Sequence, residues 1–231
     1  MIRPRIRDGA RLLGRSDREW PASTPPDVVR MWVRGAGRLD VLSVRIVTVA
    51  GTRAATPYGE LVAHDLAAGL AAAGWTVATT GALGIAGAAT RGALSSGGSV
   101  LVLPAGGLTA PLPLAHRVLF DRAAAAGALL STSDRPPDAG RDVIARGRLL
   151  AAWSTAAVLV EPGHRGESRV IAWLARDTGV PLLAAPGPVT SAESAYAHAL
   201  IRTGSARLVT GAAHVLADLN GGDRVPAEHQ S

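Results

Sequence analysis

The residues of this sequence best suited to chemistry are glycines and arginines that directly follow apolar runs. Gly51, Thr52 and Arg53 come after the run VRIVTVA (44–50). At such a position glycine lets the backbone approach a ligand, and threonine offers a hydroxyl. The guanidinium can meet a phosphate at a helix N-terminus. The pattern predicts an anion site at this loop, and a solvated charge or a local ion pair is the alternative for Arg53.

Two further glycine-rich loops follow apolar runs. Gly81, Gly84 and Gly87 form GxxGxxG after the second apolar run, WTVATT (75–80). This is not the GxGxxG of a dinucleotide-binding fold. The acidic residue that such a fold carries about 20 residues later is also missing. Gly106 and Gly107 in PAGGLT could form an amide nest for an anion or a plain turn. The chain contains no Lys, so the GxxxxGK[ST] phosphate loop is excluded.

Two arginines stand close together in IARGRLLAAW (144–153). Arg146 and Arg148 lie two residues apart, before an apolar helical segment. If that segment begins at a strand-end loop, both guanidinium groups face the same crevice as Arg53. Solvent-exposed charge at a helix start is the alternative. Trp153 could stack on a base, but a place in the core is the simpler interpretation.

Patterns for catalysis and metal binding are weak. The six histidines form no HExxH motif and have no metal-ligand spacing. There is no GxSxG, and the absence of Cys excludes thiol catalysis, disulfides and Cys-ligated metals. His164 follows a strand beside Glu161 and Arg165, where a surface histidine is the simpler interpretation. We therefore expect no catalytic residue, no metal site and no cofactor.

Composition favours a globular protein with an anionic partner. The 231 residues are 48% hydrophobic and 18% charged, with a net charge of +6 and every basic residue an Arg. Such a surplus suits nucleic acid, because guanidinium groups bind phosphate in bidentate fashion. Aromatic residues make up only 3%, which argues against domains that stack bases on an aromatic sheet. No apolar run approaches the roughly 18 residues of a membrane span, and the charged N-terminus lacks the apolar region of a signal peptide. A cytoplasmic location without membrane contact is predicted.

From Val44 onward, short apolar strands alternate with helical segments. This alternation predicts a parallel sheet with helices on both faces, whose ligands bind at the carboxyl ends of the strands. Strands are expected at 44–50, 75–80, 100–103, 128–131, 156–160, 181–185 and 207–209. Helices are expected at 57–74, 85–97, 114–127, 141–153, 167–179, 191–204 and 211–219.

The chain divides into three parts by composition. Residues 1–43 form an Arg-rich extension that begins as an arm or linker and packs on the core through apolar residues of 31–42. Within residues 1–18, six Arg face two Asp. This arm either contacts phosphates or is a solvated tail. Residues 44–220 form the α/β domain, and 221–231 a C-terminal tail.

Several long segments together resemble the DprA/Smf family of DNA-processing proteins, over about residues 10–218. They include VAGTRAATPYGE, GWTVATTGALGIAGAATRGAL, GRLLAAWSTAAVLVEP and PGPVTSAESAYAHALIRTGSARLVT. The resemblance implies an extended Rossmann-like, doubly wound fold and a homodimer that binds single-stranded DNA and loads a RecA-type recombinase. Natural transformation is the family's usual setting. The resemblance implies neither catalysis nor a cofactor.

The family's phosphate-contacting motifs are G-[SA]-R, S-G-x-A-x-G-I-D and R-N-R. They place Gly51, Thr52 and Arg53, then Gly81, Ala82, Gly84 and Ile85, then Arg146 and Arg148 at the DNA. With Arg91 and the glycines of PAGGLT, the predicted DNA-binding residues are Gly51, Thr52, Arg53, Gly81, Gly84, Arg91, Gly106, Gly107, Arg146 and Arg148.

The sequence departs from the family pattern at the second loop. Thr79 and Thr80 replace Ser-Gly, Ala86 replaces the Asp, and the expected His falls near Thr90; Leu83 also belongs to the altered loop. The Asn of R-N-R is Gly147. Losing an Asp–His pair removes side chains that could fix the loop by hydrogen bonding.

Three hypotheses follow. The first is a non-enzymatic single-stranded DNA binder. The second is a nucleotide hydrolase of the phosphoribohydrolase type, whose P-G-G-x-G-T-x-x-E motif corresponds to PAGGLTAPLP, without the Glu. The third is a degenerate DprA paralogue that acts as a protein-interaction module and has lost DNA binding, as the altered second loop would permit.

Overall fold

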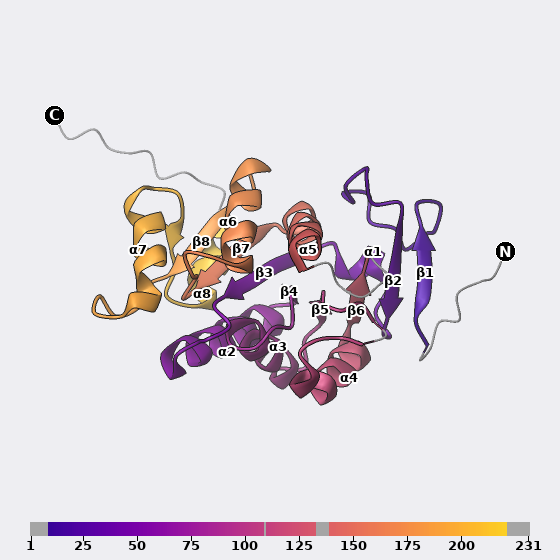
Figure 1. Ribbon diagram of the computed structural model, residues 1–231, viewed down its shortest axis with the longest axis horizontal. Helices are drawn as coiled ribbons and strands as arrows, with labels where there is room; N and C mark the ends of the chain where they lie inside the picture. The colour runs from indigo at the N-terminus through magenta and orange to yellow at the C-terminus, as the bar shows by residue number, and fades with distance from the viewer. Residues whose placement is uncertain (1–8, 109, 133–138, 221–231) are drawn as a thin grey trace.

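The computed structural model describes residues 9–108, 110–132 and 139–220. Within them a single nine-stranded sheet runs through the molecule in the order β1-β2-β6-β5-β4-β3-β7-β8-β9. The strands from β3 onward pair in parallel with one another, while β1–β2 and β2–β6 are antiparallel. Figure 1 shows the sheet between two layers of helices. The predicted α/β, Rossmann-like class is confirmed.

The strands are short, and the central ones are buried on both faces. Their bounds are β1 Arg11–Gly14, β2 Arg30–Arg34, β3 Ile46–Gly51, β4 Thr76–Thr79, β5 Val100–Val102, β6 Ala128–Ser131, β7 Ala156–Val160, β8 Leu182–Ala185 and β9 Arg207–Leu208. Full burial explains why β4 to β8 are continuous apolar or small-residue runs rather than alternating ones.

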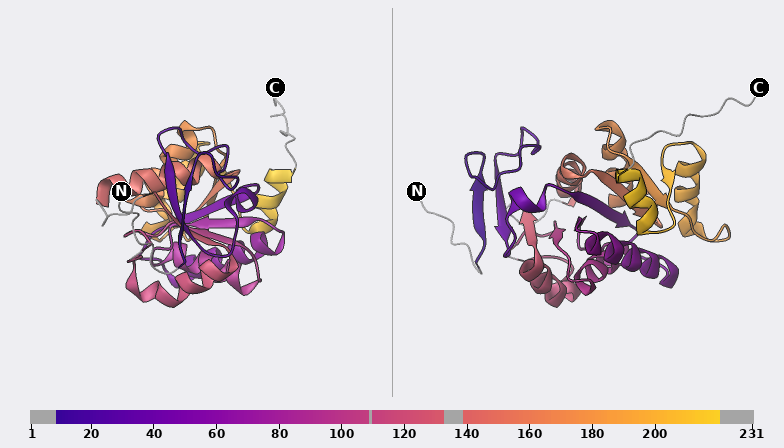
Figure 2. Two further views of the ribbon diagram at one scale, coloured as in Figure 1. Left: turned by 90° about the vertical axis from the view of Figure 1, so that its right-hand side faces the viewer. Right: turned by 180° about the vertical axis from the view of Figure 1, so that it is seen from behind.

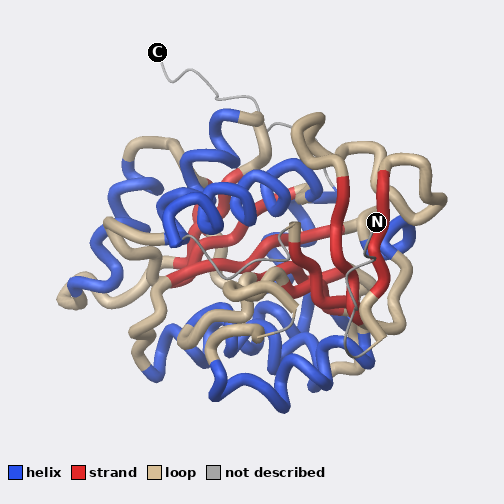
Figure 3. The backbone as a smooth tube through the Cα atoms, turned by 45° about the vertical axis from the view of Figure 1, so that its right-hand side comes forward, coloured by secondary structure: helices blue, strands red, loops and turns tan. Residues whose placement is uncertain are grey.

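Each face of the sheet has its own helices, as Figures 1 and 3 show. One face carries α2 (Pro57–Ala72), α3 (Ile85–Ser95), α4 (Arg117–Ala126) and α8 (Ala212–Asn220). The other carries α1 (Leu39–Leu42), α5 (Ala139–Trp153), α6 (Glu167–Asp177) and α7 (Ala195–Arg202). Short 3-10 turns, η1 (Leu114–His116) and η2 (Ala192–Ser194), precede α4 and α7.

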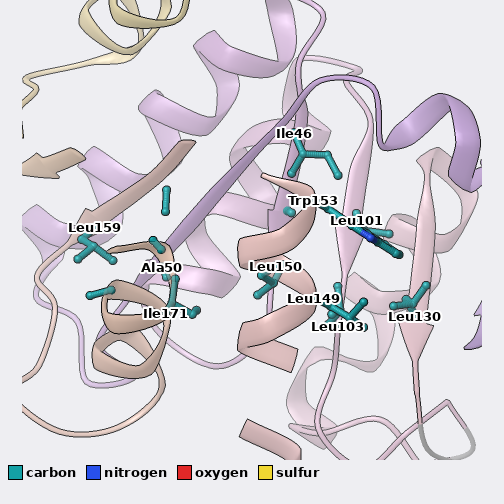
Figure 4. Packing of buried hydrophobic residues seen from close by; sticks show 14 of the residues in the cluster. Ile46, Ala50, Leu101, Leu103, Leu130, Leu149, Leu150, Trp153, Leu159 and Ile171 are labelled. Carbon is teal, nitrogen blue, oxygen red and sulfur yellow. The ribbon is translucent and has the colours of Figure 1, made fainter. Parts of the chain in front are cut away.

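Two apolar clusters, one on each face, hold the layers together. Figure 4 shows the cluster on the α5–α6 face, where Leu149, Leu150 and Trp153 of α5 pack with Ile46 of β3 and Ile171 of α6. Trp153 is therefore a core residue, as the simpler interpretation predicted, and its indole nitrogen donates to Oγ1 of a buried threonine at 3.2 Å. On the opposite face, the side chain of Phe120 in α4 is fully buried.

The N-terminal segment differs from the expected arm. Residues 11–14 and 30–34 form β1 and β2, which continue the sheet beyond β6 and lie at one end of it in Figures 1 and 2. The guanidinium of Arg11 donates to Glu19 and to two backbone carbonyls of the loop after β2, which fixes the pair against that loop. The sequence pattern does not indicate β1 because Leu13 is its one buried side chain. The division at residue 43 stays a prediction, and residues 1–8 and 221–231 lie outside the described parts.

The order of the strands places a switch point beside β3. From β3 the chain steps outward through β4, β5 and β6, and then returns to β7 on the other side of β3. The loops after β3 and β7 therefore diverge toward opposite helical layers and open a crevice between them. In sheets of this kind the crevice is where ligands bind.

Close packing of α2 on α3 depends on Gly92. A Cβ at this position would lie 2.0 Å from the carbonyl oxygen of His64. Gly92→Ala should force the helices apart and lower the free energy of unfolding by about 1–3 kcal/mol, a typical overpacking cost. Urea denaturation measures this loss. In Gly211→Ala, the control, the new Cβ meets open space and stability should be nearly unchanged. Equal stabilities for the two variants would contradict the packing argument.

Candidate nucleic-acid interface

A cavity of about 660 Å³ lies at the switch point. Segments that follow β3, β4, β5 and β7 form its walls, together with residues of α5 and α6. Its lining residues are Ala50, Gly51, Thr52, Arg53, Ala54, Thr80, Ala82, Leu83, Ala86, Ala105, Leu112, Pro113, Val143, Arg146, Arg165, Gly166, Glu167, Ser168 and Ile171. Predicted residues from all three family motifs are thus brought to one place.

The loop after β3 is fixed by its own backbone. Thr52 donates its N–H to the carbonyl of Glu161 at 3.0 Å, and its carbonyl accepts the N–H of Ile85 at 3.2 Å. Its hydroxyl accepts the N–H of Ala54 at 3.2 Å. These bonds tie the loop to the end of β7 on one side and to α3 on the other. The polar groups of Thr52 are engaged, which leaves the side chain of Arg53 as the group directed to solvent.

Glu161 is a buried carboxylate that supports the same loop. It is the one non-glycine residue with positive φ (42°) in the described chain, a conformation that costs energy and persists only where surroundings enforce it. Its carboxylate accepts the N–H of Thr56 at 2.9 Å and the hydroxyl of Thr56 at 2.5 Å. Thr56 in turn caps α2 by accepting the N–H of Gly59. A Cβ at Gly59 would lie 2.2 Å from a carboxylate oxygen of Glu161, so a larger residue there would displace this carboxylate from Thr56.

The altered second loop has its own hydrogen-bond chain. The N–H of Gly81 donates to Thr79 Oγ1 at 3.1 Å, and Thr90 Oγ1 donates to the carbonyl of Ala86 at 2.8 Å. The two buried hydroxyls are 2.9 Å apart. Because Thr90 uses its proton on Ala86, Thr79 must donate to Thr90. The loop that was expected to lose its support is therefore held by two threonines.

A histidine that no sequence pattern singled out also supports this loop. His116 of η1 is buried, and its Nδ1 lies 2.8 Å from the carbonyl oxygen of Gly81. A Cβ at Gly87 would lie 2.5 Å from the imidazole, so that glycine makes room for the ring. His116 is remote in sequence from the loop, and only the fold brings it there.

Two helices begin at the cavity without a side-chain cap. α3 starts after Gly84 (φ 68°) and α6 after Gly166 (φ 91°). Ala86 in the first turn of α3 and Ser168 in the first turn of α6 line the cavity. The free amides and dipoles of two helix N-termini thus favour an anion in this space. Gly84 is also a point of close approach, because a Cβ there would lie 2.5 Å from the carbonyl oxygen of Thr52.

Arg53 and Arg165 are cavity arginines that form no ion pair within the described part of the chain. Both side chains are exposed, and neither has a hydrogen-bonding or ionic partner among the described residues. In the sequence, Arg165 stands out only as a neighbour of His164. Its position, shortly before a helix that follows β7, is the signal that could have identified it.

Arg146 lies in the cavity wall but is already paired. It is buried, it donates to Glu167 Oε1 through Nε (3.1 Å) and Nη2 (2.6 Å), and its Nη1 donates to Asp142. Burial raises the pKa of the Asp142 carboxyl above its ordinary value; the charge of Arg146 opposes this rise and that of Glu167 adds to it. The guanidinium of Arg146 therefore joins α5 to α6. A direct contact between Arg146 and a phosphate stays a prediction.

The remaining predicted residues lie outside the cavity lining. Arg91 of α3 is near Glu60 at 3.8 Å, and Arg148 pairs with Asp27 at 2.7 Å, both on the surface. Gly106 and Gly107 form a buried turn with positive φ after β5. Gly81 is buried against the ring of Phe120 in α4. Gly84 is also absent from the lining. Contact with DNA stays a prediction for all ten of the residues that the sequence analysis assigned to it.

Gly147, which stands where the family pattern has Asn, packs against α6. A Cβ here would lie 2.8 Å from Leu174 Cδ1. The glycine therefore leaves room for the side chain of Leu174 between α5 and α6.

Comparisons with known proteins agree on the family. The sequence profile of the DNA recombination-mediator protein A family matches residues 11–220. The chain belongs to this family, DprA. It is 44% identical over 223 residues to a putative DNA processing protein DprA of Mycobacterium tuberculosis, with 89% of this chain and 56% of the relative covered. The chain thus spans about half the length of that relative.

Solved structures of DprA proteins share the fold. DprA of Streptococcus pneumoniae superposes with a TM-score of 0.82 at 26% identity, covering 90% of this chain and 74% of the other. DNA processing protein A of Helicobacter pylori, a structure that concerns single-stranded DNA binding, gives 0.77 at 22% identity, covering 93% and 97%.

Metal-binding and membrane-spanning features are both missing from the described residues. No three His, Asp or Glu side chains there gather closely enough to hold a metal ion. No helix among them is long and apolar enough to cross a bilayer.

Thr90→Val tests the hydroxyl chain of the second loop. It keeps the side-chain shape but leaves the Thr79 proton buried without an acceptor, so stability should fall by about 1–3 kcal/mol. Urea denaturation measures the loss. Thr203→Val removes a similar bond to a carbonyl four residues earlier at the surface and should cost much less. If Thr90→Val were as stable as the parent protein, the loop would not depend on these hydroxyl hydrogen bonds.

Asp142→Asn tests the Arg146 cluster through pH. The raised pKa means that folded Asp142 binds a proton more readily than the unfolded chain does. Relative to Asp142→Asn, the parent protein should therefore gain stability as pH falls from the folded pKa toward the ordinary value of 3.8, and no further below it. Urea midpoints of both proteins across this range give the difference. A difference that grows with rising pH would contradict the assignment.

Proposed function

We propose that this chain binds single-stranded DNA, without catalysis, through the cavity at the switch point. The observation that carries the proposal is the pair of unpartnered arginines, Arg53 and Arg165, beside two uncapped helix N-termini in the described part of the chain. The proposal also draws on the family, because the structure of DNA processing protein A of Helicobacter pylori concerns its binding of single-stranded DNA.

The lining of the cavity suits both parts of a nucleotide strand. Arg53 and Arg165 match a phosphate backbone, whereas Leu83, Leu112 and Pro113 offer apolar surface to sugars and bases. Leu83 and Leu112 are both exposed. No aromatic side chain is among the described lining residues, so we expect little preference between bases.

The family supports a wider role. We propose that the chain works in the cytoplasm as a homodimer that protects incoming single strands and delivers them to a RecA-type recombinase in transformation or recombination. The matched family is named for mediating recombination, which supports the recombinase as partner.

Arg53→Ala and Arg165→Ala test the proposal directly. Removing one charged contact should weaken binding to a labelled 30-nucleotide oligo-dT roughly ten- to hundredfold. The slope of log affinity against log salt should become less negative by about 0.7 for each phosphate that is no longer neutralised. Fluorescence anisotropy at several salt concentrations measures both quantities.

The control is Arg122→Ala, which removes an exposed arginine of α4, outside the cavity lining. It should leave affinity nearly unchanged. A truncated protein without residues 1–8 keeps β1 and β2, and it separates cavity binding from non-specific attraction by the three arginines of that segment. If binding vanishes with those residues and is indifferent to Arg53 and Arg165, the chain is a degenerate paralogue. Release of free base from a nucleoside monophosphate would instead favour the hydrolase.

A further inference from the structure

The exposed side of α6 carries a basic and aromatic surface that begins at the cavity. We define the α6 stripe as Arg165, Arg169, Trp173 and Arg176. All four side chains are exposed. Within α6 the spacing of four and three residues places Arg169, Trp173 and Arg176 on one side of the helix, and Arg165 stands two residues before the helix begins. Figure 1 shows α6 in the helical layer opposite α2, α3 and α4.

Trp173 differs from the other tryptophans of the chain. It is 59% exposed, whereas Trp32, Trp75 and Trp153 are at most 8% exposed and Trp20 is partly buried in the N-terminal segment. An aromatic ring of this size is normally buried, because its burial is among the larger contributions to a core. The other face of α6 is well packed in the core. The exposure of Trp173 therefore indicates a surface that binds another molecule.

The charge around Trp173 is positive and not neutralised. Arg176 and Arg165 have no ionic partner among the described residues, and Arg169 donates only to a backbone carbonyl, that of His164, at 3.1 Å. Glu167, in the first turn of α6, pairs with Arg146 at the cavity. The stripe therefore carries three positive charges, and Asp177, four residues after Trp173, is the one exposed carboxylate of α6 beside it.

We propose that the α6 stripe continues the DNA track out of the cavity, with a base stacked on Trp173 and phosphates at Arg169 and Arg176. This inference rests on the proposed function. Arg165 joins the two surfaces, since it lines the cavity and begins the stripe. At a helical rise of about 1.5 Å per residue, the part of the stripe from Arg169 to Arg176 extends the track by roughly 10 Å.

The arrangement of charge favours nucleic acid over a protein partner as the occupant. Arginines that flank a single exposed ring match the alternation of phosphates and bases along a strand. The stripe has only the Trp173 ring and half-buried Val170 as apolar surface, whereas the centre of a protein interface is enriched in apolar residues and depleted of charge.

Intrinsic fluorescence reports on Trp173 directly. Iodide should quench mainly this exposed tryptophan in the free protein. Titration with 20-nucleotide oligo-dT should remove the iodide-accessible component, while a five-nucleotide oligo-dT should remove less of it at equal occupancy. In Trp173→Phe both changes should be much smaller, because Trp32, Trp75 and Trp153 are buried and Trp20 is partly buried. Accessibility of Trp173 that is unchanged at saturating oligo-dT would overturn the proposal.

Binding by variants provides the second readout. Trp173→Ala should weaken binding of the 20-nucleotide oligomer roughly five- to hundredfold, the range for removal of one stacked base. Arg176→Ala should weaken it and make the salt slope less negative by about 0.7. The matched controls are Leu61→Ala on α2, an apolar residue 60% exposed, and Arg122→Ala on α4. Both should bind like the parent.

The outcomes separate the two proposals. If Arg53→Ala and Arg165→Ala weaken binding while Trp173→Ala binds like the parent, the proposed function stands and the extended track is overturned. If neither the parent nor any variant binds the oligomer, both proposals fail. Retained DNA binding by Trp173→Ala, with impaired binding to a RecA-type recombinase, would overturn the track in favour of a protein-docking surface.

Discussion

The structure of the site depends on how tightly the loop after β3 is clamped. Thr52 is bonded to Glu161 at the end of β7 and to Ile85 at the start of α3, and the strained Glu161 also holds the N-terminus of α2. Gly51 and Gly84 permit these approaches, since a Cβ at either would collide with backbone or side-chain atoms. The loop is therefore set before any ligand arrives, and the following arginine is presented from a rigid base. Such preorganisation lowers the entropic cost of binding.

The switch in strand order converts this local geometry into a site. Because β4 and β7 lie on opposite sides of β3, the loops and helices that follow them flank the same crevice from both helical layers. One layer contributes the start of α3 and the other the start of α6, with Arg165 beside it. The Arg146 cluster then joins α5 to α6 behind the cavity, which leaves Arg53 and Arg165 as the free charges among the described lining residues.

Much of the fold was predictable because its strands and helices have clear local patterns. β-branched and small apolar runs indicated the strands from β3 onward, and Pro57 and Gly74 marked the ends of α2. The strands β1 and β2 were not predicted, because charged residues surround them and their pairing is long-range. The site was predicted in part: the loop with Arg53 was found, but the pairing of Arg146 and the support from Thr90 depend on contacts between distant segments. No local pattern encodes such contacts.

The central claim is that a preformed cavity binds the phosphate backbone of single-stranded DNA. The most direct test is amide hydrogen exchange with and without saturating oligo-dT. The account predicts that DNA slows exchange at the first turns of α3 and α6 and in residues 52–54, since those segments line the cavity. It predicts no change in α4, none of whose residues line the cavity. Protection confined to residues 9–30, with the cavity amides unaffected, would contradict the account and assign DNA binding to the basic N-terminal segment.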